Sequence, residues 1–264
     1  MPTALVTGAS SGIGRELARL AARDRLDVVL VARRRERLAE LAQELTTRFG
    51  ITAEIVVADL ADPDAAQLVF QAARARSGGV DFLVNNAGIG VHGLFAETPI
   101  DRELEMLRVN VLALTELTKY CVNGMIERRR GRILNVASTA AFQPGPLMAV
   151  YYATKAYVLS FTEALAEELS GTGVTATALC PGPTRTEFQE KAGFGDVPLL
   201  RGPLVSNAAR VARVGWDGAK RGKRVVVPGF ANRVLALGAR LSPRRLSTKI
   251  ARRLQENRKR EGTT

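Results

Sequence analysis

The sequence predicts an α/β fold built around a parallel sheet of seven strands. Short runs rich in β-branched residues alternate with helical stretches along almost the whole chain, which is typical of repeated strand–helix–strand units. A glycine-rich loop joins the first of these runs to the first helical stretch. The chain has 264 residues, 46% of them hydrophobic, and this is enough apolar material for one large core. We therefore expect a single α/β domain.

The expected elements follow one another in a regular order. The seven strands are expected near residues 4–6, 28–31, 52–57, 82–84, 132–136, 174–179 and 225–227. The first helix should begin at Arg15, and a helix over residues 37–49 should end at Gly50, because glycine commonly closes a helix. Asp62 and Pro63 should cap the next helix, with the proline in its first position.

Residues 7–14, with the sequence TGASSGIG, form the glycine-rich loop. Glycines let the backbone turn sharply and approach a pyrophosphate, whose charge is favoured by the free N–H groups at the start of the next helix. A tight turn without a ligand is the alternative, and the position of the loop between a strand and a helix argues against it. The sequence therefore predicts a dinucleotide site at this loop.

Arginine occupies residues 33–35, directly after the second expected strand. An NAD site usually has a carboxylate near this point, which holds the ribose 2′-hydroxyl. The guanidinium of Arg33 favours a 2′-phosphate instead, so NADP(H) is the expected cofactor, with Ser10 and Ser11 as additional donors. The alternative is a solvated basic first turn, although cations at a helix start oppose the helix dipole.

Polar residues also follow the third and fourth expected strands. Asp59 and Leu60 end the third strand, and residues 85–88, with the sequence NNAG, end the fourth. Open α/β sheets bind ligands at the carboxyl ends of their strands, and Asp59 could accept a hydrogen bond from an adenine amino group. Ordinary turn chemistry would explain either segment alone, because Asn and Gly are common in turns.

Tyr151 and Lys155 lie four residues apart, so a helix would place them side by side on one face. A nearby ammonium in a half-buried site would stabilise the phenolate by about 3 kcal/mol and lower the tyrosine pKa by about two units. Tyr151 is then a candidate general acid or base, and Lys155 the residue that tunes it. The spacing alone is weak evidence, because a tyrosine and a lysine four residues apart more often form a packed tyrosine beside a solvated lysine.

Taken together, these motifs resemble the classical short-chain dehydrogenase/reductase family. Residues 7–14, Asp59, residues 85–88, Asn110, Ser138, Tyr151, Lys155, Pro181 and Gly182 occur in the order and approximate spacing of that family, over roughly residues 3–230. The resemblance implies a Rossmann-type, doubly wound, seven-stranded parallel sheet with helices on both faces, and an oxidoreductase that uses NAD(P). It further implies contacts to NADP(H) by Gly8, Ser10, Ser11, Gly12, Ile13, Gly14, Arg33, Asp59, Leu60, Asn86, Ala87, Gly88, Tyr151, Lys155, Pro181, Gly182, Thr184 and Thr186.

The resemblance also implies the catalytic roles. Ser138 would polarise a substrate carbonyl, Tyr151 would pass the proton, and Asn110 would hold a water in the proton relay. Lys155 would bind the nicotinamide ribose and lower the tyrosine pKa. Developing negative charge on the carbonyl oxygen needs donors, which agrees with Ser138 and Tyr151. Tyr152 does not fit the spacing, so we expect it to pack or to line the pocket.

Two mostly apolar stretches are expected to line the substrate pocket. They are residues 143–148 and residues 188–204, the second of which contains Phe188, Phe194, Val197, Leu199 and Leu200. They favour a lipophilic ketone such as a 3-oxoacyl chain, a steroid or an aromatic carbonyl. The leading hypothesis is therefore an NADP(H)-dependent carbonyl reductase or alcohol dehydrogenase. The alternative is a non-catalytic NADP-binding or membrane-associated scaffold of the same fold.

Composition limits the partners and the compartment. Cys121 and Cys180 lie in apolar surroundings and are expected to be buried thiols, and with His92 as the only histidine we expect no metal site. The chain shows no secretory segment and no membrane-spanning apolar run, so a cytoplasmic location is expected. A homodimer or homotetramer is also expected. Aromatic residues are only 5% of the chain, which argues against a nucleic-acid surface.

Residues 233–264 form a basic extension beyond the catalytic domain, which is expected over residues 1–232. The chain has a net charge of +12, and residues 233–260 contain ten Lys or Arg against the single acid Glu256. Leu246, Ile250 and Leu254 recur every four residues and would form a narrow apolar stripe on a helix flanked by cations. The stripe would pack on the body or on a second subunit, or it would anchor the protein to anionic lipid.

Overall fold

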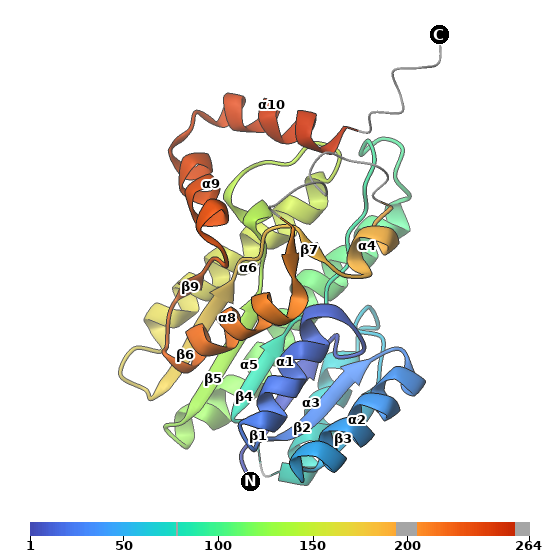
Figure 1. The fold of residues 1–264 in the computed structure, drawn as a ribbon, viewed down its shortest axis with the longest axis vertical. Coiled ribbons are helices and arrows are strands. Elements are labelled where there is room, and N and C mark those ends of the chain that lie inside the picture. Colours follow the sequence, from blue (N-terminus) through green and yellow to red (C-terminus); the bar gives the residue numbers. More distant parts are fainter. Residues whose placement is uncertain (78, 194–204, 257–264) are drawn as a thin grey trace.

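The computed structural model describes residues 1–77, 79–193 and 205–256, and its core is a parallel sheet of seven strands. The spatial order is β3-β2-β1-β4-β5-β6-β9, in which the chain starts near the middle and winds outward in both directions. Every neighbouring pair in this sheet is parallel. The doubly wound α/β prediction is therefore confirmed (Figure 1).

All seven predicted strands are present, within one or two residues of their expected ends. They are β1 Thr3–Thr7, β2 Asp27–Ala32, β3 Ala53–Val57, β4 Phe82–Asn85, β5 Gly131–Val136, β6 Val174–Leu179 and β9 Val225–Val226. Two further strands of two residues each, β7 Thr184–Arg185 and β8 Ser206–Asn207, pair with one another outside the main sheet. This pair was not predicted, because two residues are too few to show a strand pattern.

Helices cover both faces of the sheet. The helices are α1 Gly12–Arg23, α2 Arg35–Phe49, α3 Ala65–Ser77, α4 Ile100–Leu107, α5 Ala113–Glu127, α6 Ala149–Glu168, α7 Phe188–Lys191, α8 Ala208–Lys220, α9 Phe230–Leu241 and α10 Arg244–Gln255. A π-helical turn over Arg108–Leu112 joins α4 to α5, and a 3-10 turn over Thr139–Phe142 follows β5. Helices α1, α2 and α8 share one apolar core with the sheet, and α3, α5 and part of α6 share another.

The two cores follow from the alternation of side chains along the strands. In β1, Ala4 and Val6 face the core that contains α1, whereas Leu5 between them faces the core that contains α3. Trp216 of α8 is 1% exposed and stacks on Phe82, with ring centroids 4.1 Å apart. Because the strands are buried on both sides, the carboxyl edge of the sheet is where ligands can reach the backbone.

Two of the predicted helix starts are wrong. Helix α1 begins at Gly12 and not at Arg15, so the last glycines of the loop already belong to the helix. Pro63 lies in a turn before α3, where Ala65 N donates to Asp62 O, and the helix begins only at Ala65. By contrast, Gly50 ends α2 as predicted, with a positive φ of 63° that suits glycine.

Helices α9 and α10 lie at the end of the molecule opposite the N-terminus (Figure 1). The expected boundary between residues 232 and 233 falls inside α9, so the extension begins as a continuation of a body helix. Helix α10 forms as predicted, and its apolar stripe is only partly covered, since Leu246, Ile250 and Leu254 are 52%, 48% and 40% exposed. The packed face instead carries Ser247, Ala251 and Gln255.

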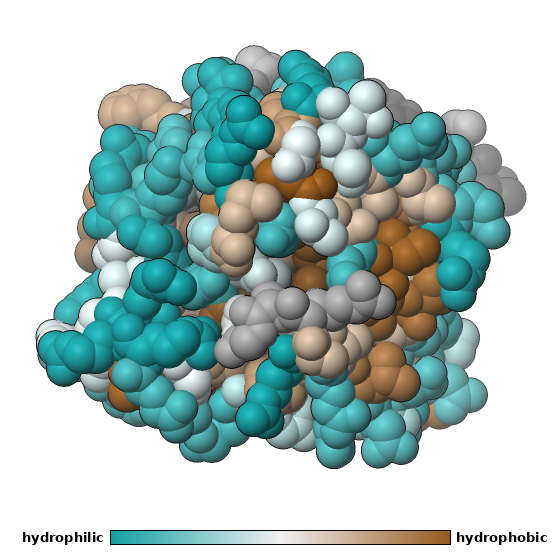
Figure 2. All heavy atoms as spheres, turned by 90° about the horizontal axis from the view of Figure 1, so that it is seen from below, coloured by the Kyte–Doolittle hydropathy of each residue, from teal (hydrophilic) through white to brown (hydrophobic). Residues whose placement is uncertain are grey.

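The opposite end of the molecule has a different surface. Figure 2 shows the face at the N-terminal side, where hydrophilic residues surround smaller hydrophobic areas.

Cys121 and Cys180 are both buried, as expected from the sequence. Among the residues that the structure describes, no helix combines the length and hydropathy that crossing a bilayer requires.

Candidate active site

A cavity of about 1080 Å³ opens at the carboxyl edge of the sheet and reaches from the glycine loop to α9 and α10. Most of the predicted site residues line it. These are Gly8, Ser10, Ser11, Gly12, Ile13, Arg33, Asp59, Leu60, Asn86, Ala87, Gly88, Ser138, Tyr151, Lys155, Pro181, Gly182, Thr184 and Thr186. Gly14 and Asn110 are not among the lining residues.

The glycine loop turns the chain at the carboxyl end of β1. Gly8 and Gly12 have positive φ angles of 66° and 55°, which glycine adopts without strain. Gly14 serves packing, because a Cβ at that position would lie 2.4 Å from Gly8 O and 2.4 Å from Asn86 Nδ2. Ser11 precedes the first turn of α1 without a side-chain capping hydrogen bond in the described structure. The N–H groups of that turn therefore suit an anionic ligand.

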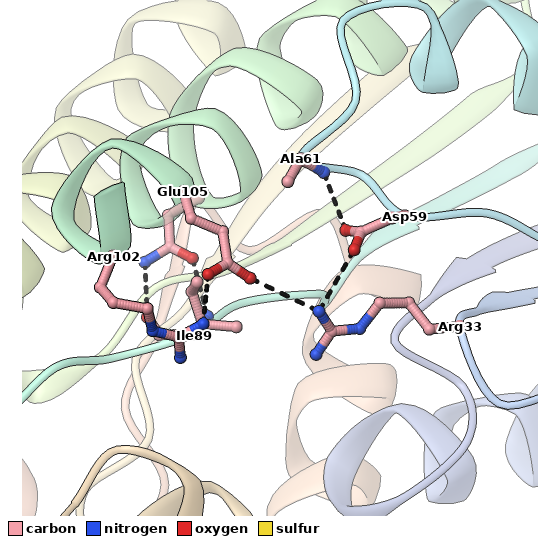
Figure 3. Close-up of polar contacts among 7 residues, drawn as sticks. Arg33, Asp59, Ala61, Ile89, Arg102 and Glu105 are labelled. Atoms are coloured by element: carbon pink, nitrogen blue, oxygen red, sulfur yellow. Dashed lines mark hydrogen bonds and ion pairs between the residues drawn. The ribbon is translucent and has the colours of Figure 1, made fainter. Parts of the chain in front are cut away.

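Arg33 lies between two carboxylates at one side of the cavity (Figure 3). Its Nη1 is 3.2 Å from Asp59 Oδ2 and 3.4 Å from Glu105 Oε1, and Glu105 also pairs with Arg102. Asp59 Oδ1 accepts a hydrogen bond from Ala61 N at 3.0 Å. With its side chain 55% exposed, Arg33 gains little from these ion pairs, each about 0–1 kcal/mol, and can exchange them for a phosphate.

Arg34 connects the glycine loop to the segment after β7. Its Nη2 donates to Ser10 Oγ at 3.0 Å, and its Nη1 lies 2.8 Å from Glu187 Oε2. The sequence showed Arg34 only as one of three consecutive arginines, and the contribution of Glu187 was missed because 153 residues separate the two. Two guanidinium groups thus line the cavity beside the loop, and this arrangement fits a nucleotide that carries an additional phosphate.

The segment after β4 is tied to the glycine loop by side-chain hydrogen bonds. Thr7 Oγ1 accepts from the backbone N of Asn86 and of Ala87, both at 3.0 Å. Asn86 Nδ2 donates to Thr7 O at 3.0 Å and to Gly8 O at 3.3 Å. Gly88 follows at the edge of the cavity, where an added Cβ would lie 3.3 Å from Lys155 Nζ. The predicted NNAG segment therefore fixes the loop as well as lining the site.

Ser138, Tyr151 and Lys155 meet at the middle of the cavity. Tyr151 and Lys155 share one face of α6, and Lys155 Nζ lies 5.8 Å from the Tyr151 ring centroid. Ser138 Oγ accepts a hydrogen bond from Ala140 N at 3.1 Å, and its hydroxyl is close enough to Tyr151 to affect the tyrosine pKa. Lys155 is 5% exposed, and its Nζ donates to Val136 O at 2.9 Å. The lysine is therefore held in place and is not solvated.

The predicted lowering of the Tyr151 pKa is wrong for this structure. Burial raises the pKa of Tyr151 to about 12, and the hydrogen bond with Ser138 opposes the rise only in part. Burial also lowers the pKa of Lys155 to about 8, because its ammonium is as poorly solvated as the phenol. The Lys155 ammonium points to the Val136 carbonyl. Tyr151 is therefore protonated at neutral pH.

Asn110 lies behind the cavity wall and organises the backbone there. Its Nδ2 donates to Ile89 O at 3.0 Å and to Thr154 Oγ1 at 3.1 Å, and its Oδ1 accepts from Ile89 N at 2.9 Å. The π-helical turn that contains it widens the helix between α4 and α5. The side-chain amide is thus engaged with protein groups next to Gly88. Its expected role in holding a water stays a prediction.

The segment after β6 closes the other side of the cavity. Pro181 O accepts from Thr139 N at 2.8 Å, and Thr184 Oγ1 donates to Gly182 O at 2.8 Å. Thr186 is held through Gln189 Oε1, which lies 3.2 Å from its backbone N and 3.2 Å from its Oγ1. These internal bonds position the loop beside the glycine loop, where Thr186 lies close to Gly12.

The far end of the cavity is lined mainly by apolar residues. Of the two predicted stretches, Gln143, Met148, Phe188, Gln189 and Lys191 line the cavity. Phe194, Val197, Leu199 and Leu200 lie outside the described residues. The structure adds a wall that the sequence analysis did not foresee. This wall is formed by Val234, Leu235 and Ala236 of α9 and by Ile250, Ala251 and Leu254 of α10, together with the polar Asn232 and Ser247. Tyr152 of α6 adjoins it and lines the cavity, which is one of the two roles expected for this residue.

The fold and site define a class of protein, namely a nucleotide-binding α/β protein with a Ser-Tyr-Lys cluster at the carboxyl edge of its sheet. Residues 2–194 match the family model for short chain dehydrogenases. This chain belongs to that family, as the resemblance in its motifs had indicated.

Two curated relatives and one solved structure illustrate the similarity. A putative ketoacyl reductase of the granaticin polyketide synthase from Streptomyces violaceoruber is 42% identical over 72% of this chain and 70% of its own length. A short chain dehydrogenase from Pseudocercospora fijiensis is 39% identical over 70% of this chain, and the match spans only 60% of that relative. A short-chain dehydrogenase from Sphingobium yanoikuyae, solved with NADPH, has a TM-score of 0.82 and 35% identity, with 91% of this chain and 94% of that chain covered.

Proposed function

We propose that this chain is an NADP(H)-dependent oxidoreductase that transfers a hydride between the nicotinamide and a carbonyl or secondary alcohol. The observation that carries the proposal is the cluster of the buried Lys155 with the half-buried Ser138 and Tyr151, which faces the same cavity as the glycine loop and Arg33 and Arg34. The NADP(H) prediction is confirmed at the level of the family, since the similar Sphingobium structure contains NADPH. The cofactor supplies the hydride, and the protein residues supply orientation and a proton.

The three central side chains divide the work. Tyr151, whose phenol is protonated at neutral pH, would donate its hydroxyl proton to the carbonyl oxygen as negative charge develops there. Ser138 would donate a second hydrogen bond to the same oxygen, and both donors are fixed before the reaction, as electrostatic stabilisation requires. Lys155 would hold the ribose and place a positive charge beside the tyrosine after the proton has left.

The substrate is proposed to be a lipophilic ketone, for example a 3-oxoacyl chain, a steroid or an aromatic carbonyl. The mainly apolar wall from α6, α9 and α10 supports this class, because most of its lining side chains offer a substrate apolar contact and no hydrogen bond. The similarity to a putative ketoacyl reductase agrees with the 3-oxoacyl choice. We also assign the opposite direction, alcohol oxidation, to the same site when the oxidised cofactor is supplied.

A ketone panel with NADPH tests the proposal against the scaffold alternative. Sustained NADPH oxidation with at least one lipophilic ketone is expected, and Tyr151→Phe serves as the matched control that keeps the cavity but removes the proton. A protein that binds NADPH and reduces no member of a panel of acyl, steroid and aromatic ketones would favour the non-catalytic scaffold. The best substrate would narrow the class.

We further propose that α9 and α10 touch an anionic membrane surface. Helix α9 exposes Phe230, Val234, Leu237 and Leu241 along one face, and Phe230 and Leu241 are 81% and 77% exposed. The adjoining α10 carries its half-exposed apolar stripe between cations. Each cation near an anionic lipid surface contributes about 1 kcal/mol, and the apolar side chains add burial. Such contact would bring a lipophilic substrate to the cavity, whose wall these helices form.

Vesicle co-sedimentation tests the membrane proposal. The full chain should pellet with anionic vesicles at low salt and not with neutral ones, and Lys249→Glu combined with Arg253→Glu should abolish pelleting. Equal, negligible pelleting of the full chain and a chain ending at Ser242 would remove the membrane proposal. Loss of oligomer in the shorter chain would instead assign the stripe to a second subunit. A cytoplasmic location with peripheral membrane contact stays a prediction.

A homodimer or homotetramer is proposed from another surface. Helix α4 and the following π-helical turn expose Ile100, Leu104, Leu107 and Leu112, and the first of these is 62% exposed. Adjacent large apolar side chains on one exposed element commonly mark an interface with another protein copy. Light scattering after size exclusion should give twice or four times the chain mass, and Leu104→Glu should reduce it.

A further inference from the structure

Helix α10 is held against the cavity by polar contacts and not by its apolar stripe. An amphipathic helix normally buries its large apolar residues, yet Leu246, Ile250 and Leu254 stay 40% to 52% exposed. The buried face has Ser247, Ala251 and Gln255, which contribute little apolar area. Something other than hydrophobic burial must therefore fix the carboxyl end of α10.

Gln255 makes the contacts that fix this end. It is 0% exposed, and its Nε2 lies 2.8 Å from Tyr152 Oη. Its backbone carbonyl accepts a hydrogen bond from His92 Nε2 at 3.0 Å. These two bonds join α10 to α6 and to the segment that follows β4. Both partners lie more than 100 residues away in the sequence, so no local pattern could reveal the junction.

Tyr152 carries this junction into the substrate cavity. Its ring lines the cavity and stands edge-on to the ring of Tyr151, with centroids 6.1 Å apart. The ring packs closely against the preceding loop at Gly145, where a Cβ would lie 2.3 Å from it. Burial raises the pKa of Tyr152, which keeps its hydroxyl neutral and able to hydrogen-bond Gln255. Tyr152, which is adjacent to the proposed acid Tyr151, therefore helps to set the position of α10.

The junction is not saturated. Gln255 Oε1 has no hydrogen-bond partner in the described part of the chain, although Nε2 of the same amide is paired with Tyr152 Oη. A buried amide with one unpaired end holds its element less firmly than a fully paired one would. Replacing a single side chain at the contact between Gln255 and Tyr152 should therefore loosen α10 and open the cavity wall that α10 forms.

We propose that Gln255 is a specificity-determining positioning residue, which sets the size of ketone that fits by fixing α10 against Tyr152. The inference rests on the proposed carbonyl reduction, because it names what limits the substrate at that same site. Ala251 and Leu254, one turn and one residue before Gln255, line the cavity and would move with it. A ketone with a short substituent fits inside the closed wall, and a longer one requires the wall to open.

The first test measures kcat and KM with NADPH for straight-chain ketones of increasing length. In Gln255→Ala and in Tyr152→Phe, the ratio of kcat/KM for long over short ketones should rise about fivefold, the equivalent of one hydrogen bond. The double variant should give no larger change, because both single changes break the same bond. Thr248→Ala is the matched control, since Thr248 Oγ1 donates only to Arg244 O within α10.

A second readout does not depend on activity. Amide hydrogen exchange in residues 244–255 should become about fivefold faster in Gln255→Ala and in Tyr152→Phe, while exchange in α8 stays unchanged. Unchanged exchange in α10 would overturn the inference even if the enzyme proves active. A uniform fall of kcat/KM for all ketone lengths would also overturn it, since that is the signature of a general structural defect. If no ketone is reduced but exchange rises as expected, the proposed function fails and the junction stands.

Discussion

Replacing Lys155 by methionine should make the protein more stable at neutral pH, although the lysine is proposed to be essential for activity. Burial lowers the pKa of Lys155 from its ordinary value of 10.5 to about 8. This difference corresponds to about 3 kcal/mol of folding free energy spent on keeping a buried charge. Methionine removes that cost and leaves Val136 O without its lysine donor, which costs about 2 kcal/mol. The variant should therefore gain about 1 kcal/mol at pH 7.

The difference in stability between the wild type and the Lys155→Met variant should change sign with pH. Between pH 8 and 10.5 the folded protein has released the Lys155 proton while the unfolded chain still binds it, so wild-type stability rises with pH relative to the variant. Above pH 10.5 the lysine is neutral in both states, and the variant should be the less stable by about 2 kcal/mol.

Urea unfolding of the cofactor-free protein at several pH values from 7 to 10.5 measures the effect. Lys119→Met is the control, because Lys119 is exposed on α5 and its replacement should show no reversal of sign. A Lys155→Met variant that is less stable than wild type at pH 7, or whose difference does not change with pH, would refute the reasoning.

Three further predictions concern the site and the core. Tyr151→Phe should lower kcat at least about a hundredfold while the NADPH dissociation constant stays near normal, and more than a few per cent of wild-type kcat would refute its role as the acid. Arg33→Asp should shift the NADP to NAD ratio of kcat/KM toward NAD by about 2 kcal/mol, near the low end for lost phosphate bonds because Asp59 and Glu105 repel the new carboxylate. An unchanged ratio would indicate that Arg34, and not Arg33, binds the 2′-phosphate of the cofactor. Trp216→Ala should destabilise the fold by about 3–5 kcal/mol in urea unfolding, and a loss below 1 kcal/mol would contradict its place in the core.

The sheet and the cofactor half of the cavity were predictable because their signals are local. Each strand shows as a short β-branched run, and a residue at the end of such a run must lie at the carboxyl edge of a parallel sheet. Asp59 and Asn86 could therefore be placed beside the glycine loop without coordinates. Gly50 was predictable for a similar reason, because its left-handed backbone conformation suits glycine.

The errors have physical causes that composition does not reveal. Pro63 fits the first turn of a helix and also a turn that precedes a helix. In the structure the Asp62 carbonyl accepts a hydrogen bond from Ala65 N, which forms such a preceding turn. The pKa of Tyr151 depends on how dry the cavity is and where the Lys155 ammonium points, and spacing along α6 specifies neither. The burial of Gln255 in preference to Leu254 depends on Tyr152 and His92, which the sequence places far away.

Helix α6 connects the proposed chemistry to substrate selection through two adjacent residues. Successive residues on a helix point about 100° apart, so Tyr151 can face Ser138 while Tyr152 faces α10. The family model ends at residue 194, and the α9 and α10 wall that meets Tyr152 is built entirely from later residues. The reacting groups and the wall are therefore built from separate segments, and the Tyr152–Gln255 hydrogen bond is one of the contacts that couple them. A change of substrate in this protein should accordingly be sought first in residues 230–255 and only then around Tyr151.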